Sequence, residues 1–214
     1  MQDFNAASAN HLVLTLLLAT RNAHKTREFA ALLGRDFDVA DLTRAGDLEP
    51  VEENGATFEE NAVLKATAAS RARPGLVVAD DSGLEVEALG GAPGIRSARY
   101  AGGDATDEAN VTKLLAALGD DTHRAAQFRC VLALAENGRM LAVFEGQVHG
   151  RITHAPAGGG GFGYDPVFVP DGYDKPFGEL GSTVKNAISH RSRAVDALRE
   201  YLLQNKKGGD KRRP

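Results

Sequence analysis

The stretch Leu76-Val77-Val78-Ala79-Asp80-Asp81-Ser82-Gly83 places two adjacent carboxylates at the end of an apolar run. The run predicts a buried strand, and Asp-Ser-Gly predicts a turn at its end. Successive side chains of a strand point to opposite faces, so the two aspartates share a face only if the backbone turns between them. Hard cations such as Mg²⁺ take carboxylate oxygens together with water and phosphate, which makes this stretch a candidate metal site. A strand end followed by a turn, with no metal, is the alternative.

Strand and helix patterns alternate on both sides of this stretch. Strands are predicted at 12–19, 76–79 and 167–169, and the pair 125–135 and 139–152 forms a hairpin through Asn137-Gly138. Helices are predicted at 23–33, 57–73, 106–118 and 190–203 from capping residues and apolar periodicity. Because βα units are combined with a long antiparallel hairpin, we expect an α/β fold with a mixed sheet in two lobes.

Composition limits the location and the partners. The chain has 214 residues, of which 43% are hydrophobic and 25% charged, as is typical of a soluble globular protein. The net charge of −4 gives no general attraction to nucleic acid or to an anionic membrane, so an anionic ligand requires local basic clusters. The single cysteine, Cys130, excludes an intrachain disulfide and fits a reducing compartment such as the cytoplasm.

The two ends of the chain differ from the rest. The apolar residues 12–19 are too few to span a bilayer, and the only charge before them, unless His11 is protonated, is that of Asp3, which argues against a signal peptide. We expect a flexible extension over 1–10, one two-lobed domain over 11–204 and a basic mobile tail over 205–214. Contact between this tail and nucleic acid is the less favoured alternative.

A basic pair lies at the start of the last predicted helix. Ser189 is a favourable N-cap, so His190 and Arg191 fall in the first turn, where the helix dipole disfavours each cation by about 0.3–1 kcal/mol. A bound anion would reverse this penalty, since helix N-termini offer free N–H groups and arginine adds a bidentate donor. The alternatives are therefore an anion site and a solvated helix start.

A similar basic start follows the first predicted strand. Asn22 is placed to cap the helix that begins at Ala23, which brings Lys25 near Thr20 and the N-terminal N–H groups. This arrangement is typical of a phosphate site. It is not a P-loop, because His24 stands where Gly-Lys-Thr requires glycine. A basic first turn on the protein surface is the alternative.

Four consecutive glycines precede Phe162. The run 158–163 satisfies G-x-G-x-x-G, but Tyr-Asp-Pro and another apolar strand follow it rather than a helix, so a dinucleotide site is rejected. The glycines allow the backbone to approach a ligand closely, and the Phe162 ring offers a face on which a base can stack. A flexible loop beside a core phenylalanine is the alternative. The sequence contains neither His-Glu-x-x-His nor Gly-x-Ser-x-Gly.

An ordered series of motifs runs from about residue 12 to residue 203. It consists of Thr20-x-Asn22-x-x-Lys25, Glu52-Glu53-x-Gly55, Phe58-x-Glu60-Asn61-Ala62-x-x-Lys65-Ala66, Asp80-Asp81-Ser82-Gly83-Leu84, Leu89-Gly90-Gly91-Ala92-Pro93-Gly94, Ser97-Ala98-Arg99-Tyr100, Gly161-Phe162-Gly163-Tyr164-Asp165-Pro166, Lys185 and Ser189-His190-Arg191. The series resembles the inosine triphosphate pyrophosphatase family of non-canonical purine nucleoside triphosphate pyrophosphatases. So many motifs in one order are far more specific than any one of them.

The resemblance implies an elongated α/β fold with a central mixed sheet, a cleft between two lobes, and a homodimer. It also implies Mg²⁺-dependent cleavage of ITP, dITP or XTP to the monophosphate and pyrophosphate. By position, Glu52 and Asp81 would hold the metal, and Asp81 would orient or deprotonate the attacking water. The residues implied to contact the triphosphate are Thr20, Arg21, Asn22, Ala23, His24, Lys25, Lys65 and Lys185, and those implied to surround the nucleoside are Ser82, Phe162, Gly163, Tyr164, Asp165, His190 and Arg191.

The chemistry of the residues agrees with this resemblance. Lys65 lies on a mostly apolar helix stripe, so its ammonium must reach solvent or an anion. Lysines and Mg²⁺ supply the charge neutralisation that phosphoryl chemistry requires. A donor such as Arg191 favours a 6-keto purine over adenine, although it does not exclude guanine. Arg21 replaces the glycine that is usual in the family, so either its φ is negative or the phosphate loop is shifted.

Two other functions share part of this pattern. A regulatory module that binds a nucleotide without hydrolysis would use the basic turns and the glycine loop, but it would not need Glu52 and Asp81. A Maf-type pyrophosphatase acting on modified pyrimidine nucleotides is the second, and the Ser-His-Arg and Gly-Phe-Gly-Tyr-Asp segments argue against it. A substrate panel with product analysis separates the three functions.

Overall fold

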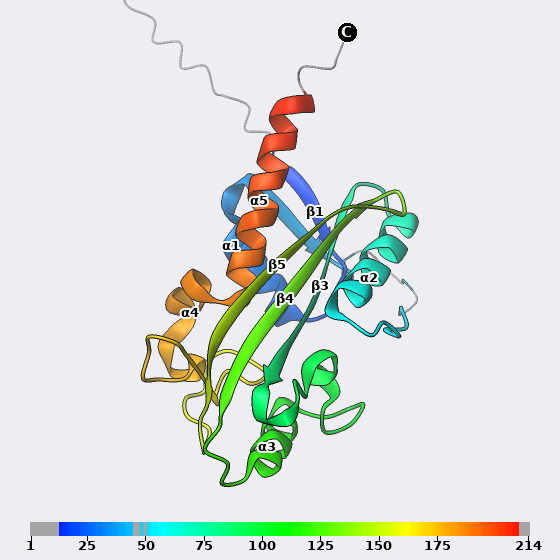
Figure 1. The fold of residues 1–214 in the computed structure, drawn as a ribbon. Helices are drawn as coiled ribbons and strands as arrows, with labels where there is room; N and C mark the ends of the chain where they lie inside the picture. Colours follow the sequence, from blue (N-terminus) through cyan, green and yellow to red (C-terminus); the bar gives the residue numbers. More distant parts are fainter. Residues whose placement is uncertain (1–12, 45–47, 49–50, 210–214) are drawn as a thin grey trace, which may run out of the picture.

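The computed structural model describes residues 13–44, 48 and 51–209, with backbone only for 206–209. Within these residues, six strands form one mixed sheet in the order β2-β1-β3-β4-β5-β6 (Figure 1). The predicted α/β fold is confirmed. The strands are β1 (Leu14–Leu18), β2 (Phe37–Asp41), β3 (Leu76–Val86), β4 (Ala125–Glu136), β5 (Arg139–Ile152) and β6 (Phe168–Pro170). The helices are α1 (Ala23–Leu33), α2 (Phe58–Ala72), α3 (Asp107–Leu118), α4 (Phe177–Ile188) and α5 (His190–Gly209), with 3-10 turns η1 (Gly34–Asp36), η2 (Glu87–Leu89) and η3 (Gly94–Arg99).

Strand β3 continues through both aspartates. It pairs antiparallel with β4 along its whole length, and Asp80 and Asp81 lie opposite Leu132 and Val131. The predicted turn at the two aspartates is therefore wrong. Basic side chains from other elements neutralise the two carboxylates. Both aspartates can therefore lie in the middle of the strand. Because no turn intervenes, the carboxylates point to opposite faces of the sheet.

Strands β4 and β5 form the predicted hairpin. Its turn residues Asn137 and Gly138 have φ of 52° and 76°, the left-handed conformation that a two-residue hairpin turn favours. The ribbon runs along most of the molecule (Figure 1). A Cβ on Gly146 in β5 would lie 2.2 Å from the backbone oxygen of His190, so this glycine lets the start of α5 pack directly on the sheet.

Capping residues start the helices where the sequence predicts. The side chains of Asn22, Thr57 and Thr106 accept backbone N–H groups in the first turns of α1, α2 and α3. Helix α5 begins at His190 as predicted but continues to Gly209, because helix-favouring residues follow position 203 and the first breakers are two glycines. Part of the predicted tail, 205–209, is thus helical, whereas the predictions for 1–10 and 210–214 lie outside the described residues.

The sequence patterns did not predict β2 or α4. Strand β2 has only five residues, and its sequence Phe-Asp-Val-Ala-Asp lacks the strict alternation of apolar and polar side chains that predicts a strand. Helix α4 is interrupted at Gly181, whose φ of 75° is not helical, so its periodicity is broken. Strand β2 is fixed by its parallel pairing with β1, and α4 packs against α5 and β6.

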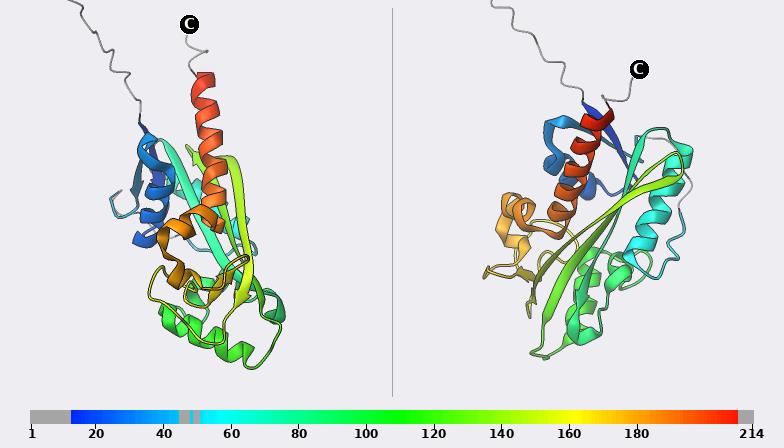
Figure 2. Two further views of the ribbon diagram at one scale, coloured as in Figure 1. Left: turned by 90° about the vertical axis from the view of Figure 1, so that its left-hand side faces the viewer. Right: turned by 45° about the horizontal axis from the view of Figure 1, so that its top comes forward.

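Buried side chains form clusters in two lobes. In the first lobe, α1 and α5 cover one face of the sheet and α2 covers the other (Figures 1 and 2). In the second lobe, α3, α4 and β6 pack with the far ends of β3, β4 and β5 around Phe128, Phe168 and Phe177. None of the helices in the described ranges is long and apolar enough to cross a membrane.

Candidate active site

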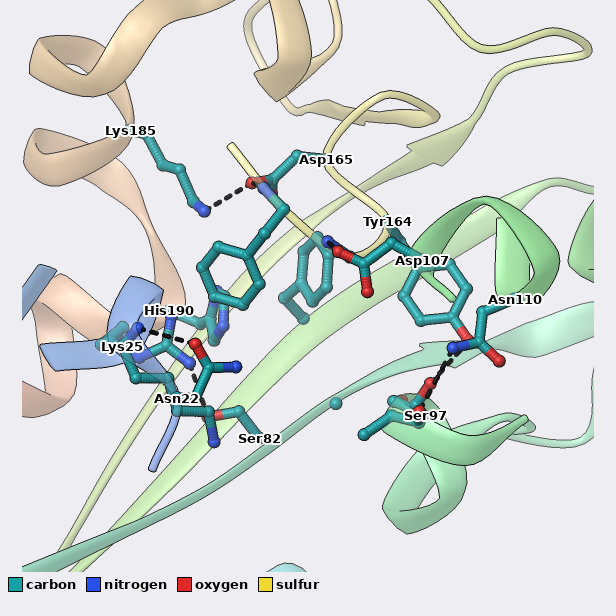
Figure 3. Close-up of a pocket in the computed structure, with 16 residues that line it drawn as sticks. Asn22, Lys25, Ser82, Ser97, Asp107, Asn110, Tyr164, Asp165, Lys185 and His190 are labelled. Carbon is teal, nitrogen blue, oxygen red and sulfur yellow. Dashed lines mark hydrogen bonds and ion pairs between the residues drawn. The ribbon is translucent and has the colours of Figure 1, made fainter. Parts of the chain in front are cut away.

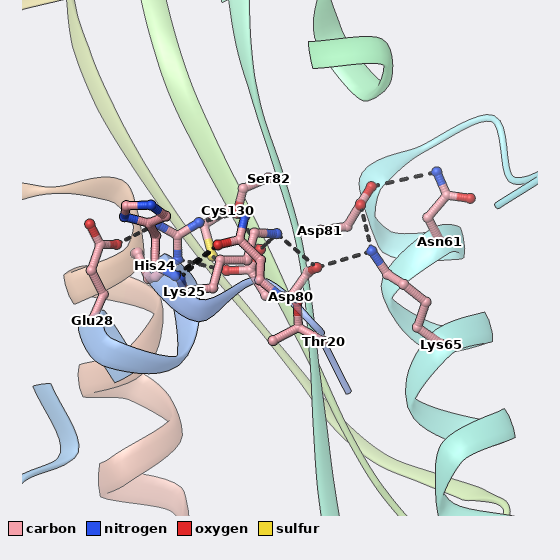
Figure 4. Close-up of polar contacts among 12 residues, drawn as sticks. Thr20, His24, Lys25, Glu28, Asn61, Lys65, Asp80, Asp81, Ser82 and Cys130 are labelled. Carbon is pink, nitrogen blue, oxygen red and sulfur yellow. Dashed lines mark hydrogen bonds and ion pairs between the residues drawn. The ribbon is translucent and has the colours of Figure 1, made fainter. Parts of the chain in front are cut away.

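Only the first residues of β3 pair with a strand on the side that faces β1. Strand β1 pairs with β3 only as far as Val78, whose carbonyl also accepts the N–H of Ala19 at 2.7 Å. Beyond this point, the Asp80 carbonyl accepts from Lys25 Nζ at 3.3 Å and from Lys65 Nζ at 3.0 Å. The two lysines come from helices on opposite faces of the sheet (Figure 4). Strands β2 and β3 lie on opposite sides of β1 and run parallel to it, so the chain changes direction across the sheet between β1 and β3. The carboxyl ends of parallel strands at such a switch point are where α/β sheets usually bind ligands.

The Asp80 carboxylate is held on the face of α1 and α5 (Figure 4). Arg191 Nε donates to it at 2.8 Å and Ser82 Oγ at 2.9 Å, and Lys25 Nζ forms an ion pair with it. Burial alone would raise the pKa of Asp80, but the Arg191 guanidinium and the Lys25 ammonium outweigh burial and hold this pKa well below its usual range. Cys130 lies beside it, with Sγ 3.4 Å from the carboxylate. Asp80 is therefore an ionised group with its partners already in place.

The Asp81 carboxylate points to the opposite face, toward α2. Lys65 Nζ donates to its Oδ1 at 2.7 Å, and Asn61 Nδ2 reaches Oδ2 at 3.5 Å. Burial raises the pKa of Asp81 even though Lys65 opposes this shift. Glu53 lies 3.5 Å from Lys65 Nζ, whereas Glu52, the predicted second metal ligand, is exposed. The predicted anion partner of Lys65 is thus Asp81, and Asp81 keeps one oxygen with a single weak contact.

The loop before α1 is ordered by Asn22. Its Oδ1 accepts the backbone N–H groups of His24 and Lys25 at 2.9 and 3.2 Å, and its own N–H donates to Thr20 Oγ1 at 3.1 Å. Arg21 has no left-handed φ, because Asn137 is the single non-glycine residue with positive φ in the described chain. The Arg21 guanidinium instead donates to the Leu48 carbonyl at 2.9 Å. The first alternative for Arg21, a negative φ, holds.

Two cations at the start of α5 and in α4 share the carboxylate of Glu28. Arg191 Nη1 lies 2.6 Å and Lys185 Nζ 2.8 Å from its two oxygens. Burial alone would raise the pKa of Glu28, but Arg191 and Lys185 lower it. Arg191 therefore meets two protein carboxylates at the helix start where an anion was predicted. No sequence motif pointed to Glu28, since its partners are more than 150 positions away.

His190 is buried in the first turn of α5. Its ring stacks on Phe128 with centroids 4.8 Å apart and planes at 12°. Burial, and then the neighbouring cations Arg191 and Lys185, lower the pKa of His190 well below its usual value, so the imidazole is neutral near pH 7. Its Nδ1 has no hydrogen-bond partner among the described residues. A buried, unpaired polar atom of this kind is available to a ligand.

The glycine loop places Phe162 against three basic side chains. Asp165 Oδ2 accepts the Phe162 N–H at 2.8 Å and the Lys185 ammonium at 2.6 Å. The centroid of the Phe162 ring lies 4.5 Å from Lys185 Nζ, 5.6 Å from the Arg191 guanidinium and 5.3 Å from the centroid of the His24 ring. Burial raises the pKa of Asp165 although Lys185 opposes it. The loop has no room for a side chain at Gly161, where a Cβ would lie 2.0 Å from Asp165 Oδ2.

Several of these groups line one cavity of about 270 Å³ (Figure 3). Its volume is near the lower end of the roughly 300–1,000 Å³ of small-molecule sites, so it has room for the nucleoside end of a nucleotide rather than the whole molecule. Ten predicted residues line it, namely Asn22, Lys25, Ser82, Phe162, Gly163, Tyr164, Asp165, Lys185, His190 and Arg191. The predicted residues outside the lining are Thr20, Arg21, Ala23, His24, Glu52, Lys65 and Asp81. The lining residues that sequence reasoning missed are Gly83, Ser97, Ala98, Asp107, Asn110 and Phe128.

Comparisons with known proteins agree with this fold. A sequence model of the Ham1 family matches residues 16–201. A protein of Bacillus licheniformis named dITP/XTP pyrophosphatase is 47% identical, with 88% of this chain and 98% of that relative covered. One of Geobacillus kaustophilus with the same name is 51% identical, with 86% of this chain and 92% of the relative covered.

Solved structures give the same result. The Ham1 protein of Staphylococcus aureus superimposes with a TM-score of 0.80 at 44% identity, covering 89% of this chain and 99% of that one. A HAM1 protein of Coxiella burnetii gives 0.81 at 40% identity, with coverages of 90% and 100%. The resemblance found from the sequence motifs is confirmed. This chain belongs to the Ham1 family.

Proposed function

We propose that this chain hydrolyses ITP, dITP and XTP to the monophosphate and pyrophosphate, and so removes non-canonical purines from the nucleotide pool. The observation that carries the proposal is the position of the cavity. It opens beside the β3 edge where Lys25 and Lys65 meet Asp80 and Asp81. A nucleoside in the cavity would bring its phosphates to this edge. The names of the relatives agree with this substrate class.

Recognition of the base follows from donors in the cavity. The neutral His190 has an unpaired Nδ1, which donates to a base in the tautomer that carries its proton there. The Arg191 guanidinium lies 5.6 Å from the Phe162 ring that would stack on the base. A 6-keto purine presents an acceptor where adenine presents a donor, so donors in the cavity favour hypoxanthine and xanthine over adenine. Lys185 supplies a further charge beside the same ring.

Hydrolysis requires a water in line with the α-phosphorus. Asp81 would orient this water and accept its proton, while the bond between the α-phosphorus and the bridging oxygen breaks and pyrophosphate leaves. Lys25 and Lys65 would neutralise the phosphate charge at the strand edge. Asp80 would keep Lys25 and Arg191 in position without contacting the water.

The oxygen donors also fit Mg²⁺. The described residues contain no group of three or more His, Cys, Asp or Glu that would hold a metal ion by themselves. Mg²⁺ is usually held by one or two carboxylates together with water and substrate phosphates, so Asp81 and Glu52 would be enough protein ligands for it. When bound, Mg²⁺ lowers the pKa of a coordinated water and neutralises phosphate charge.

A substrate panel tests the proposal. We expect Mg²⁺-dependent release of pyrophosphate from ITP, dITP and XTP at rates well above that from ATP. Products are separated into monophosphate, diphosphate, pyrophosphate and orthophosphate, with EDTA-treated enzyme as control. Equal rates on all nucleotides, or orthophosphate as the first product, would contradict the proposal.

We further propose a homodimer in the cytoplasm, on the basis of the family and of the single cysteine. Cys130 is buried, and burial raises the pKa of its thiol, so it is unreactive within the fold. Sedimentation equilibrium measures the oligomeric state, and a monomer at micromolar concentration would contradict the first part. Fractionation of cells expressing the native gene checks the second.

A further inference from the structure

Two carboxylates hold the loop that carries Phe162. One is inside the loop, where Asp165 accepts the Phe162 N–H. The other lies across the cavity in α3, where Asp107 Oδ2 accepts the N–H of Gly163 at 2.6 Å (Figure 3). Gly163 has a φ of 62°, a conformation that glycine adopts without strain. The loop is therefore fixed from both sides, by residues 56 positions apart in the case of Asp107.

The contact with Asp107 joins α3, in the second lobe, to the part of the cavity where Phe162 would stack on the base. Asp107 belongs to the first turn of α3, and it lines the cavity together with Phe162 and Gly163. A second link runs parallel to it, since Tyr164 Oη donates to the Ser97 carbonyl at 2.9 Å. The two links connect α3 and η3 with consecutive residues of the glycine loop. Movement of α3 relative to the sheet would consequently displace the Phe162 ring.

Asp107 differs from its neighbour in this contact. Glu108 is also an acid in the first turn of α3 and is also exposed, so both carboxylates interact favourably with the helix dipole. Glu108 is absent from the cavity lining, whereas Asp107 is part of it. The charge-assisted hydrogen bond to Gly163 is thus what distinguishes Asp107, and a bond to an ionised acceptor is stronger than one between neutral groups.

We propose that Asp107 is a positioning residue for the nucleobase: it holds Gly163 so that the adjacent Phe162 ring lies where a purine stacks. This inference rests on the proposed function for the identity of the ligand. It assigns no part in the hydrolytic step to Asp107, because the carboxylate acts through Gly163 and Phe162. Loss of Asp107 therefore weakens binding of the nucleoside end and leaves the phosphate end unchanged.

Two probes separate the ends of the site. IMP reports the nucleoside end and inorganic tripolyphosphate the phosphate end, both titrated by calorimetry into wild type, Asp107→Ala, Asp107→Asn and the matched control Glu108→Ala. We expect Asp107→Ala to bind IMP about tenfold more weakly, as loss of one hydrogen bond to a charged group implies. The affinity for tripolyphosphate is expected to stay within about twofold of wild type, because the lost hydrogen bond lies at the nucleoside end of the site. Asp107→Asn, which keeps an acceptor oxygen, recovers part of the loss, and Glu108→Ala binds both probes like wild type.

Steady-state kinetics give a second readout. KM for ITP rises in Asp107→Ala while kcat stays close to that of wild type. Unchanged IMP affinity in Asp107→Ala would overturn the inference, and so would an equal loss of IMP and tripolyphosphate affinity, which indicates a general structural defect. If wild type releases no pyrophosphate from ITP, the proposed function fails, whereas the two titrations still decide the role of Asp107.

Discussion

Replacing Asp80 and Asp81 one at a time by asparagine separates stability from turnover. The Asp80 side chain has no exposed surface, and its lowered pKa means that the fold favours the carboxylate. Asp80→Asn removes a counter-charge from Arg191, whose side chain is only 2% exposed and which keeps Glu28 as its remaining acid. Breaking a buried ion pair in this way costs about 3–5 kcal/mol. For a chain of this length, the melting temperature falls by roughly 6–20 °C.

Asp81→Asn is expected to affect turnover strongly and stability little. The raised pKa of Asp81 means that the ionised carboxylate is less favoured in the folded than in the unfolded chain. A neutral amide at this position therefore keeps the free energy of unfolding within about 1 kcal/mol of wild type or raises it. Turnover of ITP falls by about 10²–10⁴-fold, the usual contribution of a positioned general base.

Urea denaturation followed by circular dichroism measures the first effect, and pyrophosphate release from ITP measures the second. Asp196→Asn, an exposed change in α5, is the control that alters neither quantity. Equal destabilisation by Asp80→Asn and Asp81→Asn would refute the assignment of the two faces. Turnover by Asp81→Asn at the wild-type rate would refute its catalytic role.

Three other perturbations follow from the same geometry. Lys65→Met is expected to lower kcat for ITP by about 10²-fold, a loss comparable to that of one oxyanion donor. The control Lys175→Met, at an exposed lysine, is expected to keep the wild-type kcat. Equal rates of pyrophosphate release by the two variants would contradict the role of Lys65. The folded-state pKa of His190 is depressed, so its contribution to stability is complete above the unfolded pKa of about 6.5 and is lost as pH falls below it. Urea unfolding between pH 7 and 5 checks this sign, and His190→Gln is expected to flatten the slope. Gly83→Ala costs about 1–3 kcal/mol because its Cβ would lie 2.4 Å from a backbone oxygen. Gly159→Ala, with open space around it, unfolds like wild type, and a similar melting temperature for both variants would show that the β3 contact tolerates a methyl group.

Local signals made most of the helices and the hairpin predictable. Asn22, Thr57 and Thr106 cap helices through bonds to residues two or three positions away, and Asn137-Gly138 closes a two-residue turn. Interactions of this range depend on a few neighbouring residues, so the sequence alone contains them. The ordered motifs also indicated ten of the residues that line the cavity.

Long-range pairing decided what the sequence could not predict. The two aspartates resemble a strand end, yet β3 continues because Arg191, 111 positions away, neutralises the first and Lys65 the second. Glu28 and Asp107 escaped notice for the same reason, since their partners lie 163 and 56 positions away. No periodicity or capping rule relates residues at such distances.

The uncovered edge of β3 has a further consequence for solubility. A strand edge with free backbone groups is a template on which another chain can add a strand and start aggregation. In this protein Ser97 Oγ accepts the N–H of Leu84 and the Ala92 carbonyl accepts that of Val86, which blocks the far part of the edge. At Asp80, the two lysine ammonium groups occupy the carbonyl instead. Lys25 and Lys65, which would bind phosphate, thus also prevent self-association through this strand edge. A variant that lacks both lysines is expected to aggregate as well as to lose activity.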